Sequence, residues 1–252
     1  PLVMRGPAAV TSWSPSRLAP LGDDTLQRIT DLYSHDALLR QKLAEALAAE
    51  AIADEGAAEP ANAMRDGMRR RPLLAQRGKP GAQYAEIVKA AARFLRQENG
   101  PQVAVFDTTG WDTHFNEGGA NGQLAVRLAA LDGALSALKT NLGPVWNDTA
   151  VLLATEFGRT VAENGTRGTD HGTATAAYLL GGVVNGGRVV ADWPGLSPRK
   201  LYQDRDLRPT LDLRSVMKGL LAEHLAVPPR ALESSVFPAS REARSLSGLV
   251  RA

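Results

Sequence analysis

The chain has 252 residues, of which 44% are hydrophobic, and this length and composition are sufficient for a globular core. Its 29 basic residues nearly balance its 27 acidic residues, so the charge gives no sign of a surface for nucleic acid. The absence of cysteine excludes disulfides, thiolate nucleophiles and cysteine-bound zinc, and it leaves histidine and oxygen atoms as the ligands for any metal ion.

The start of the chain lacks the features of a signal peptide, because residues 1–10 have no basic, apolar and small-residue zones in succession. No apolar run approaches the roughly 20 residues that a membrane-spanning helix needs, so we expect no membrane span. The first residue is Pro1 rather than methionine, and we therefore expect a processed product or a fragment.

The first hundred residues are expected to form a mainly helical segment that packs on the core. After a stretch rich in Pro, Ser and Gly over residues 1–22, apolar residues recur at helical spacing. Residues 53–82 mix glycine and proline with a basic run at residues 69–71, which indicates a mobile excursion. The arginines of this run either face solvent or bind an anion. The predicted helices begin near Thr25 and cover residues 37–52 and 84–97.

From residue 101 the order of elements predicts an α/β core that extends to residue 238, followed by a tail over residues 239–252. A strand, a crossover helix and a second strand favour a parallel pair. The predicted strands cover residues 102–106, 149–154 and 174–180, and the predicted crossover helix covers residues 122–142. A hairpin is expected in the Gly-rich residues 183–190, and two helices are expected over residues 213–224 and from Pro229.

The first polar loop follows the strand predicted at residues 102–106. Asp107 comes directly after this strand, and Asp112 and His114 follow a few residues later. A carboxylate and an imidazole two residues apart in an extended loop can point to the same side, which suits a shared divalent cation or a hydrogen-bonded pair. Alternatively, Asp107 caps the turn and His114 donates to a local carbonyl group.

The second polar loop contains Glu156 and Arg159 and follows the strand predicted at residues 149–154. An acid at the carboxyl end of a strand can bind a metal ion, and an arginine can hold an oxyanion in a bidentate manner. The alternative is an ion pair between Glu156 and Arg159 that only shapes the loop.

The third polar loop contains Asp170, His171 and Gly172 and precedes the strand predicted at residues 174–180. The adjacent acid and imidazole offer two metal ligands, and the glycine permits a close approach of the backbone to a ligand. Two of the four histidines of the chain therefore lie in these polar loops.

Candidates for a nucleophile are few. The chain has no Gly-x-Ser-x-Gly elbow, no cysteine and no phosphate-binding Gly-Lys-Thr loop. A hydrolase would therefore need a metal-activated water, a threonine near His114 or His171, or a residue that precedes Pro1. In a purely structural alternative, the polar loops form a hydrogen-bonded network between sheet and helices.

The motifs GWDTH (residues 110–114), EFGRT (156–160) and TDHG (169–172), followed by LLGG, form a specific set. In these motifs the chain resembles the bacterial family known as domain of unknown function 1501, which is itself similar to the alkaline phosphatase and sulfatase superfamily. The resemblance runs from about Pro1 to Pro238 and covers the C-terminal part of the family. Its members usually begin with a twin-arginine export signal and a Gly-Gly-x-Asp-Gly segment.

The resemblance implies an alkaline-phosphatase-like fold, with three α/β/α layers, a mostly parallel central sheet and a helical N-terminal segment. Metal ligands then gather at the carboxyl edge of the sheet. On this analogy His114 resembles the histidine of the first metal loop, Glu156 takes the place of the acid in an Asp-His-Gly strand end, and His171 resembles a later single histidine. Phe157 stands where the second histidine of the superfamily would be.

These observations predict a metal-dependent hydrolase of phosphate or sulfate esters, incomplete without an N-terminal region, that acts on a small anionic ester or a carbohydrate-linked anion. The alternative is an exported, non-catalytic pseudoenzyme or binding protein that uses the same cleft. The resemblance also implies a periplasmic or secreted location. The expected divalent ion is zinc, calcium, magnesium or manganese. Its expected ligands are Asp107, Asp112, His114, Glu156, Asp170 and His171, and the expected catalytic residues are Arg159 and His171.

Overall fold

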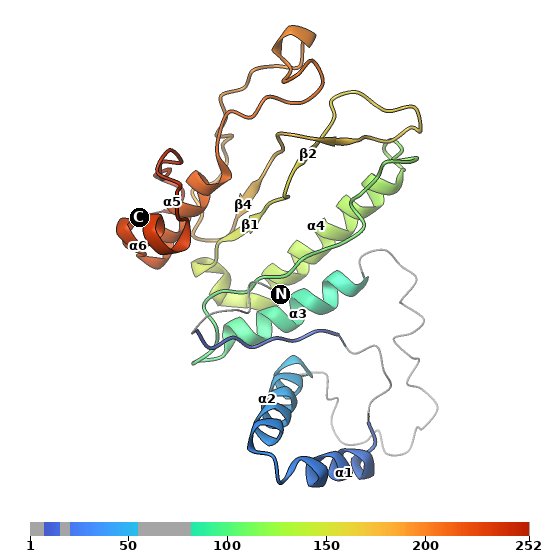
Figure 1. Ribbon diagram of the computed structural model, residues 1–252, viewed down its shortest axis with the longest axis vertical. Helices are drawn as coiled ribbons and strands as arrows, with labels where there is room; N and C mark the ends of the chain where they lie inside the picture. The colour runs from blue at the N-terminus through green and yellow to red at the C-terminus, as the bar shows by residue number, and fades with distance from the viewer. Residues whose placement is uncertain (1–7, 16–20, 55–81, 252) are drawn as a thin grey trace. The chain divides into compact units, whose positions relative to one another are not determined.

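The structure of the protein, a computed structural model, describes residues 8–15, 21–54 and 82–251 (Figure 1). The arginine run at residues 69–71 and the excursion around it lie outside the described residues. The chain divides into two compact units. The first comprises Pro1–Thr108 and Leu128–Leu142, and the second comprises Thr109–Arg127 and Gly143–Ala252.

The first unit is built from helices, and the predicted helices are confirmed as α1 (Asp23–Tyr33), α2 (Ala37–Asp54), α3 (Ala82–Arg96) and α4 (Gln123–Leu142). Helix α4 belongs to this unit from Leu128 onward. Small alanine side chains let helices approach closely, and α2 and α3 are in contact. None of the described helices combines the length and the apolar composition that crossing a lipid bilayer requires. The buried apolar side chains of the helices include Ala49, Ala53, Val88, Ala92, Leu138 and Leu142.

The strand predicted at residues 102–106 is wrong. In the described part of the chain this segment pairs with no strand, and the side chains of Val103 and Val105 are 58% and 69% exposed. A strand needs a neighbour for its backbone N–H and C=O groups, and a high β propensity alone does not supply one.

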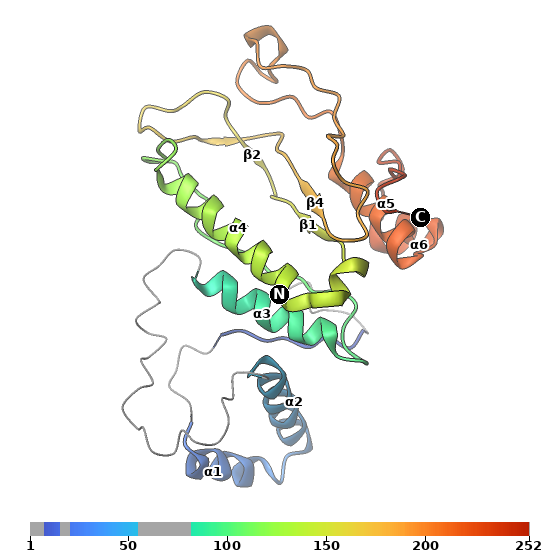
Figure 2. The same ribbon diagram turned by 180° about the vertical axis from the view of Figure 1, so that it is seen from behind.

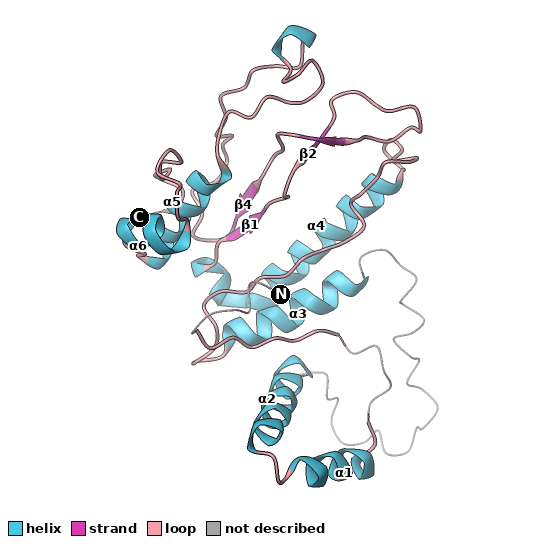
Figure 3. Ribbon diagram, in the orientation of Figure 1, coloured by secondary structure: helices cyan, strands magenta, loops and turns pink. Residues whose placement is uncertain are grey.

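The second unit contains two short antiparallel strand pairs that follow one another along a single hairpin, which we call the ribbon. Strand β1 (Val151–Leu153) pairs with β4 (Tyr178–Leu180), and β2 (Gly158–Arg159) pairs with β3 (His171–Gly172). The chain leaves β1, continues through β2, turns in residues 160–170 and returns through β3 to β4 (Figure 3).

The predicted alkaline-phosphatase-like fold is therefore wrong. The described residues are 44% helical and contain two small antiparallel sheets of two strands each, with no large parallel central sheet. The physical reason is that the parallel pair expected across the helix of residues 122–142 lacks its first strand, because residues 102–106 pair with no strand in the described part of the chain. Strand β1 pairs with β4 instead, and because the chain doubles back between them through the β2–β3 pair, these two strands meet in opposite directions.

The two halves of the ribbon are offset by one residue. Four residues connect β1 to β2, whereas five connect β3 to β4. Where β2 begins, the two backbones come very close: a Cβ atom on Gly158 would lie 1.8 Å from the carbonyl oxygen of Ala174. Only glycine fits at this position, and an offset of this kind bends a ribbon and redirects the side chains beyond it.

The C-terminal region is built around α5 (Leu213–Leu225), which confirms the helix predicted at residues 213–224 (Figure 2). Asp212 caps this helix by accepting a hydrogen bond from the N–H of Arg214 at 2.8 Å. The hairpin expected at residues 183–190 is absent from this described region, and Val184 forms a bridge with Val250 instead. The remaining elements are short: η4 (Gly143–Asp148), η5 (Pro198–Lys200), α6 (Pro229–Ala231) and the π-helical turn η6 (Leu232–Val236).

Candidate metal centre

Polar segments of the second unit meet at the turn end of the ribbon. They are the loop segment 109–117, the turn 160–170 and the β2–β3 pair. The N–H of Thr169 donates to the carbonyl oxygen of Thr113 at 3.2 Å, so the loop segment lies along the turn that leads into β3.

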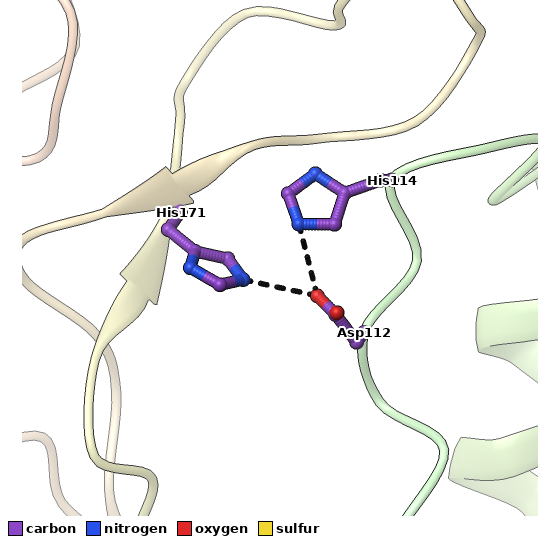
Figure 4. Close-up of side chains that lie close together, drawn as sticks. All are labelled: Asp112, His114 and His171. Carbon is purple, nitrogen blue, oxygen red and sulfur yellow. Dashed lines mark hydrogen bonds and ion pairs between the residues drawn. The ribbon is translucent and has the colours of Figure 1, made fainter.

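Asp112, His114 and His171 point toward one another at this place (Figure 4). Oδ1 of Asp112 lies 3.1 Å from Nε2 of His114 and 3.0 Å from Nε2 of His171. The centroids of the two imidazole rings are 4.7 Å apart. One possible ligand atom from each residue lies within 4.8 Å of the others, and we call these three residues the Asp–His–His cluster.

The local backbone explains how the cluster forms. Asp112 and His114 are two residues apart in a loop that bends at His114, and both side chains reach toward His171. His171 lies opposite Arg159 in the β2–β3 pair, and the ring of Phe157 packs against its imidazole with 4.3 Å between the centroids. The ribbon thus presents one histidine to a loop that carries the other ligands.

Arg159 holds Asp112 in place. Its Nη2 donates to Oδ1 of Asp112 at 2.7 Å and to the carbonyl oxygen of Trp111 at 3.0 Å, and its Nη1 donates to the carbonyl oxygen of Thr169 at 2.9 Å. The hydrogen bonds from His171 and then from Arg159 lower the pKa of Asp112. Asp112 is therefore ionised at neutral pH, which is the state that a metal ligand requires.

Asp170 contacts the other nitrogen of His114. Its Oδ1 accepts hydrogen bonds from Nδ1 of His114 and from Nδ2 of Asn164, both at 2.9 Å. These hydrogen bonds, first that from Asn164, lower the pKa of Asp170. A carboxylate on Nδ1 keeps the proton there and leaves Nε2 to face a metal ion. Asp170 thus has the position of a carboxylate that orients a histidine ligand.

Asn164 connects the turn to His114. Its Oδ1 accepts from the backbone N–H groups of Thr166 at 2.9 Å and Gly168 at 3.0 Å, and its Nδ2 donates to the carbonyl oxygen of His114 at 3.0 Å. Sequence reasoning missed this residue. The dipeptide Asn164-Gly165 is a turn signal, but nothing in it indicates a contact with a distant histidine.

Glu117 is a second residue that sequence reasoning missed. Its Oε2 accepts hydrogen bonds from the hydroxyl groups of Thr113 at 3.0 Å and Thr169 at 2.6 Å. Thr113 is only 4% exposed, so Glu117 satisfies a hydroxyl group that water does not reach. These bonds fasten the loop segment 109–117 to the turn 160–170.

Three residues predicted as ligands, Asp107, Glu156 and Asp170, are not part of the cluster, and of these Asp170 contacts Nδ1 of His114 instead. Asp107 belongs to the first unit and is exposed. Glu156 is exposed as well, and it forms no hydrogen bond or ion pair with the described residues. The ion pair between Glu156 and Arg159 that we considered from the sequence is therefore not formed, because Arg159 is bound to Asp112 instead.

The donor atoms of the cluster fit a divalent transition metal. Two imidazole nitrogens and one carboxylate oxygen form a common ligand set for such ions, and tetrahedral bonds of about 2.1 Å separate neighbouring donor atoms by about 3.4 Å. The two distances from Oδ1 of Asp112, 3.1 Å to His114 and 3.0 Å to His171, are within about 0.4 Å of this separation. The side chains of Asp112, His114 and His171 are 65%, 41% and 50% exposed, so water or a substrate can reach the cluster.

Comparison with known proteins points to one family. The family model described as "Protein of unknown function (DUF1501)" matches residues 18–235, a span that includes the whole cluster and the turn that supports it. No curated protein and no solved structure matches the chain.

Proposed function

We propose that this chain, which belongs to the DUF1501 family of proteins of unknown function, is a metal-dependent hydrolase of phosphate or sulfate esters. The observation that carries the proposal is the convergence of Asp112, His114 and His171. Three protein ligands with open remaining positions are typical of catalytic metal sites, whereas structural zinc sites are closed by four ligands.

Zinc matches these donors best. Imidazole nitrogens suit zinc and similar ions, whereas calcium and magnesium prefer sites made of oxygen atoms. The contact between Asp170 and Nδ1 of His114, at 2.9 Å, is also the kind of support that zinc-bound histidines receive. We therefore name zinc as the first candidate and manganese as the second.

A bound divalent ion supplies a Lewis acid and activates water, which removes the need for a side-chain nucleophile. The residues of this chain bind the ion and hold its ligands in place. Arg159, whose Nη2 lies 2.7 Å from Asp112, adds a fixed positive charge beside the cluster. A positive charge there favours an anionic ester over a neutral one, and this is the reason for proposing phosphate or sulfate esters.

The test begins with zinc binding, measured by isothermal titration calorimetry on the purified wild-type protein and on Asp112→Asn and His171→Ala. We expect one zinc ion per wild-type chain and a loss of affinity of about 100-fold or more in both variants, since changes outside the ligand set already cost 10–100-fold. Glu156→Gln is the matched control, because Glu156 is an exposed acid outside the cluster.

Turnover of p-nitrophenyl phosphate and p-nitrophenyl sulfate is then measured with zinc present. Turnover that disappears in Asp112→Asn and persists in Glu156→Gln supports the proposal. A wild-type protein that binds no divalent ion, or an equal loss of turnover in the control, contradicts it.

The second candidate is an exported binding protein that uses the same cluster without chemistry. Its supporting observation is the ring of Phe157, which packs on His171 at 4.3 Å between centroids and covers one face of this ligand. Zinc binding without turnover of either ester would favour this candidate.

A further inference from the structure

We propose that Asn164 is a positioning residue for His114 and that it acts through Asp170. The inference rests on the proposed metal site and says how that site is kept in a state ready for a metal ion. It assigns a role to a residue in the turn 160–170 that carries no charge and lies outside the cluster.

The side chain of Asn164 touches both the backbone of His114 and the carboxylate on its ring. Nδ2 of Asn164 donates to the carbonyl oxygen of His114 at 3.0 Å and to Oδ1 of Asp170 at 2.9 Å. The amide cannot turn freely, because its Oδ1 is bound by the N–H groups of Thr166 and Gly168. One fixed amide therefore sets the position of His114 and of its partner together.

The chemical consequence is the choice of the nitrogen that carries the proton on His114. Oδ1 of Asp170 accepts from Nδ1, so Nε2 is left to face Asp112 at 3.1 Å. The side chain of Asp170 is 53% exposed, and without Asn164 it would lose one of its two hydrogen bonds and could turn to water. His114 would then lose its fixed tautomer and its ring orientation.

The two ends of the Asn164 amide have separable roles. Oδ1 closes the turn, whereas Nδ2 reaches Asp170 and His114. Asn164→Asp keeps an acceptor for the turn, removes the donor and places a second carboxylate against Asp170. Thr166→Val removes the hydroxyl group that lies 2.6 Å from the same His114 carbonyl oxygen and 2.9 Å from Oδ1 of Asn164. It leaves the two backbone N–H groups on Oδ1 and the contact of Nδ2 with Asp170, so it is the matched control.

The experiment uses the full chain and has two readouts. Zinc affinity is measured by titration calorimetry, and the tautomer of His114 is measured by ¹⁵N NMR of the metal-free protein in mildly alkaline buffer. Asn164→Asp should bind zinc about 10–100-fold more weakly, the usual effect of losing a partner of a metal ligand. Its His114 should lose the Nδ1–H tautomer. Thr166→Val should keep the wild-type tautomer and an affinity within a few-fold of the wild type.

A second variant keeps the inference testable if Asn164→Asp folds poorly. Asp170→Ala leaves the turn contacts of Asn164. Like Asn164→Asp, it should lose the Nδ1–H tautomer of His114 and should bind zinc more weakly to the same extent. Because Asn164 acts through Asp170, the double variant should lose no more affinity than Asp170→Ala alone. An unchanged tautomer in both variants, or an equal effect of Thr166→Val, overturns the inference. Absence of zinc binding in the wild type instead contradicts the proposed function, and the tautomer still decides the role of Asn164.

Discussion

Oδ1 of Asp170 lies 2.9 Å from Nδ1 of His114, although the two residues are 56 positions apart in the chain. The contact exists because the turn 160–170 folds back along the segment 109–117. It places a carboxylate on one nitrogen of His114 and leaves the other for the Asp–His–His cluster. The cluster therefore depends on how two loops are fastened together, and residues that would never touch a metal ion should control it.

Gly168→Ala should disrupt the cluster although it changes no ligand and no charge. A Cβ atom on Gly168 would lie 2.4 Å from the carbonyl oxygens of both His114 and Thr113, so the loop segment 109–117 would have to move. We expect a loss of zinc affinity of roughly tenfold or more and a loss of stability of about 1–3 kcal/mol. Calorimetric titration and thermal denaturation measure the two effects.

The control for this variant is Gly165→Ala in the same turn, because a Cβ atom on Gly165 would meet nothing within 4 Å. It should bind zinc as the wild type does. Identical behaviour of the two alanine variants would show that the turn does not pack against the segment that carries His114.

The metal-free protein should become less stable at acidic pH, because Asp112 becomes protonated there. Hydrogen bonds from His171 and then from Arg159 lower its pKa. A carboxyl group with a lowered pKa in the folded state stabilises the fold above its unfolded pKa and loses this effect as the pH falls through the folded value. The loss should therefore begin below about pH 4. Melting temperatures measured across this range should depend less on pH in Asp112→Asn than in the wild type, whereas Glu156→Gln should keep the wild-type dependence.

The helices of the first unit could be predicted because their pattern is a property of each segment alone. Apolar spacing placed α2 at residues 37–52, and the structure extends it only to Asp54. The segment 102–106 has an equally strong β pattern, yet it forms no strand in the described part of the chain. A strand is stabilised by a neighbour, and the apolar side chains of Val103 and Val105 cannot specify one.

The location of β1 and β4 could be predicted, but their relative direction could not. Both are short apolar runs, and the direction in which two such runs pair depends on the path of the chain between them. Here that path is the β2–β3 pair with its turn, which sequence reasoning treated as loops alone. The antiparallel ribbon follows from this connection, whereas the expected parallel pair is lost because residues 102–106 form no strand.

The candidate site, like the fold, could be predicted from the sequence only in part. The sequence indicates the acids and histidines of the polar loops, and the structure brings Asp112, His114 and His171 together. In the sequence, Asp107 and Glu156 look like equally good ligands. The fold excludes them from the cluster, and the sequence pattern does not show this. Asn164 could not be found at all from local patterns, since its contact with His114 spans 50 positions.

Leu142→Ala should destabilise the first unit far more than Leu128→Ala. Both leucines lie on α4 within this unit, but Leu142 is fully buried and Leu128 is 50% exposed. Removal of a buried leucine side chain leaves a cavity and costs about 2–5 kcal/mol, whereas an exposed substitution changes stability by about 0.5 kcal/mol. Thermal denaturation followed by circular dichroism compares the two. Equal shifts in melting temperature would contradict the placement of the core on this end of α4.

Glu223→Gln should loosen the end of the chain locally. Oε1 of Glu223 accepts from the N–H of Gly248 at 2.5 Å, and Oε2 accepts from those of Leu249 at 2.8 Å and Val250 at 3.0 Å. Burial raises the pKa of Glu223, but these three N–H groups outweigh burial and lower the pKa overall, so the segment binds the charged carboxylate. A glutamine side chain has one oxygen and a donating amide, so at least one N–H group loses its acceptor, at a cost of about 1–2 kcal/mol. Hydrogen exchange of residues 248–250 should therefore become about 5–30-fold faster. Exchange should stay at the wild-type rate in Glu233→Gln, and an equal rate in both variants would mean that the carboxylate of α5 does not hold this segment.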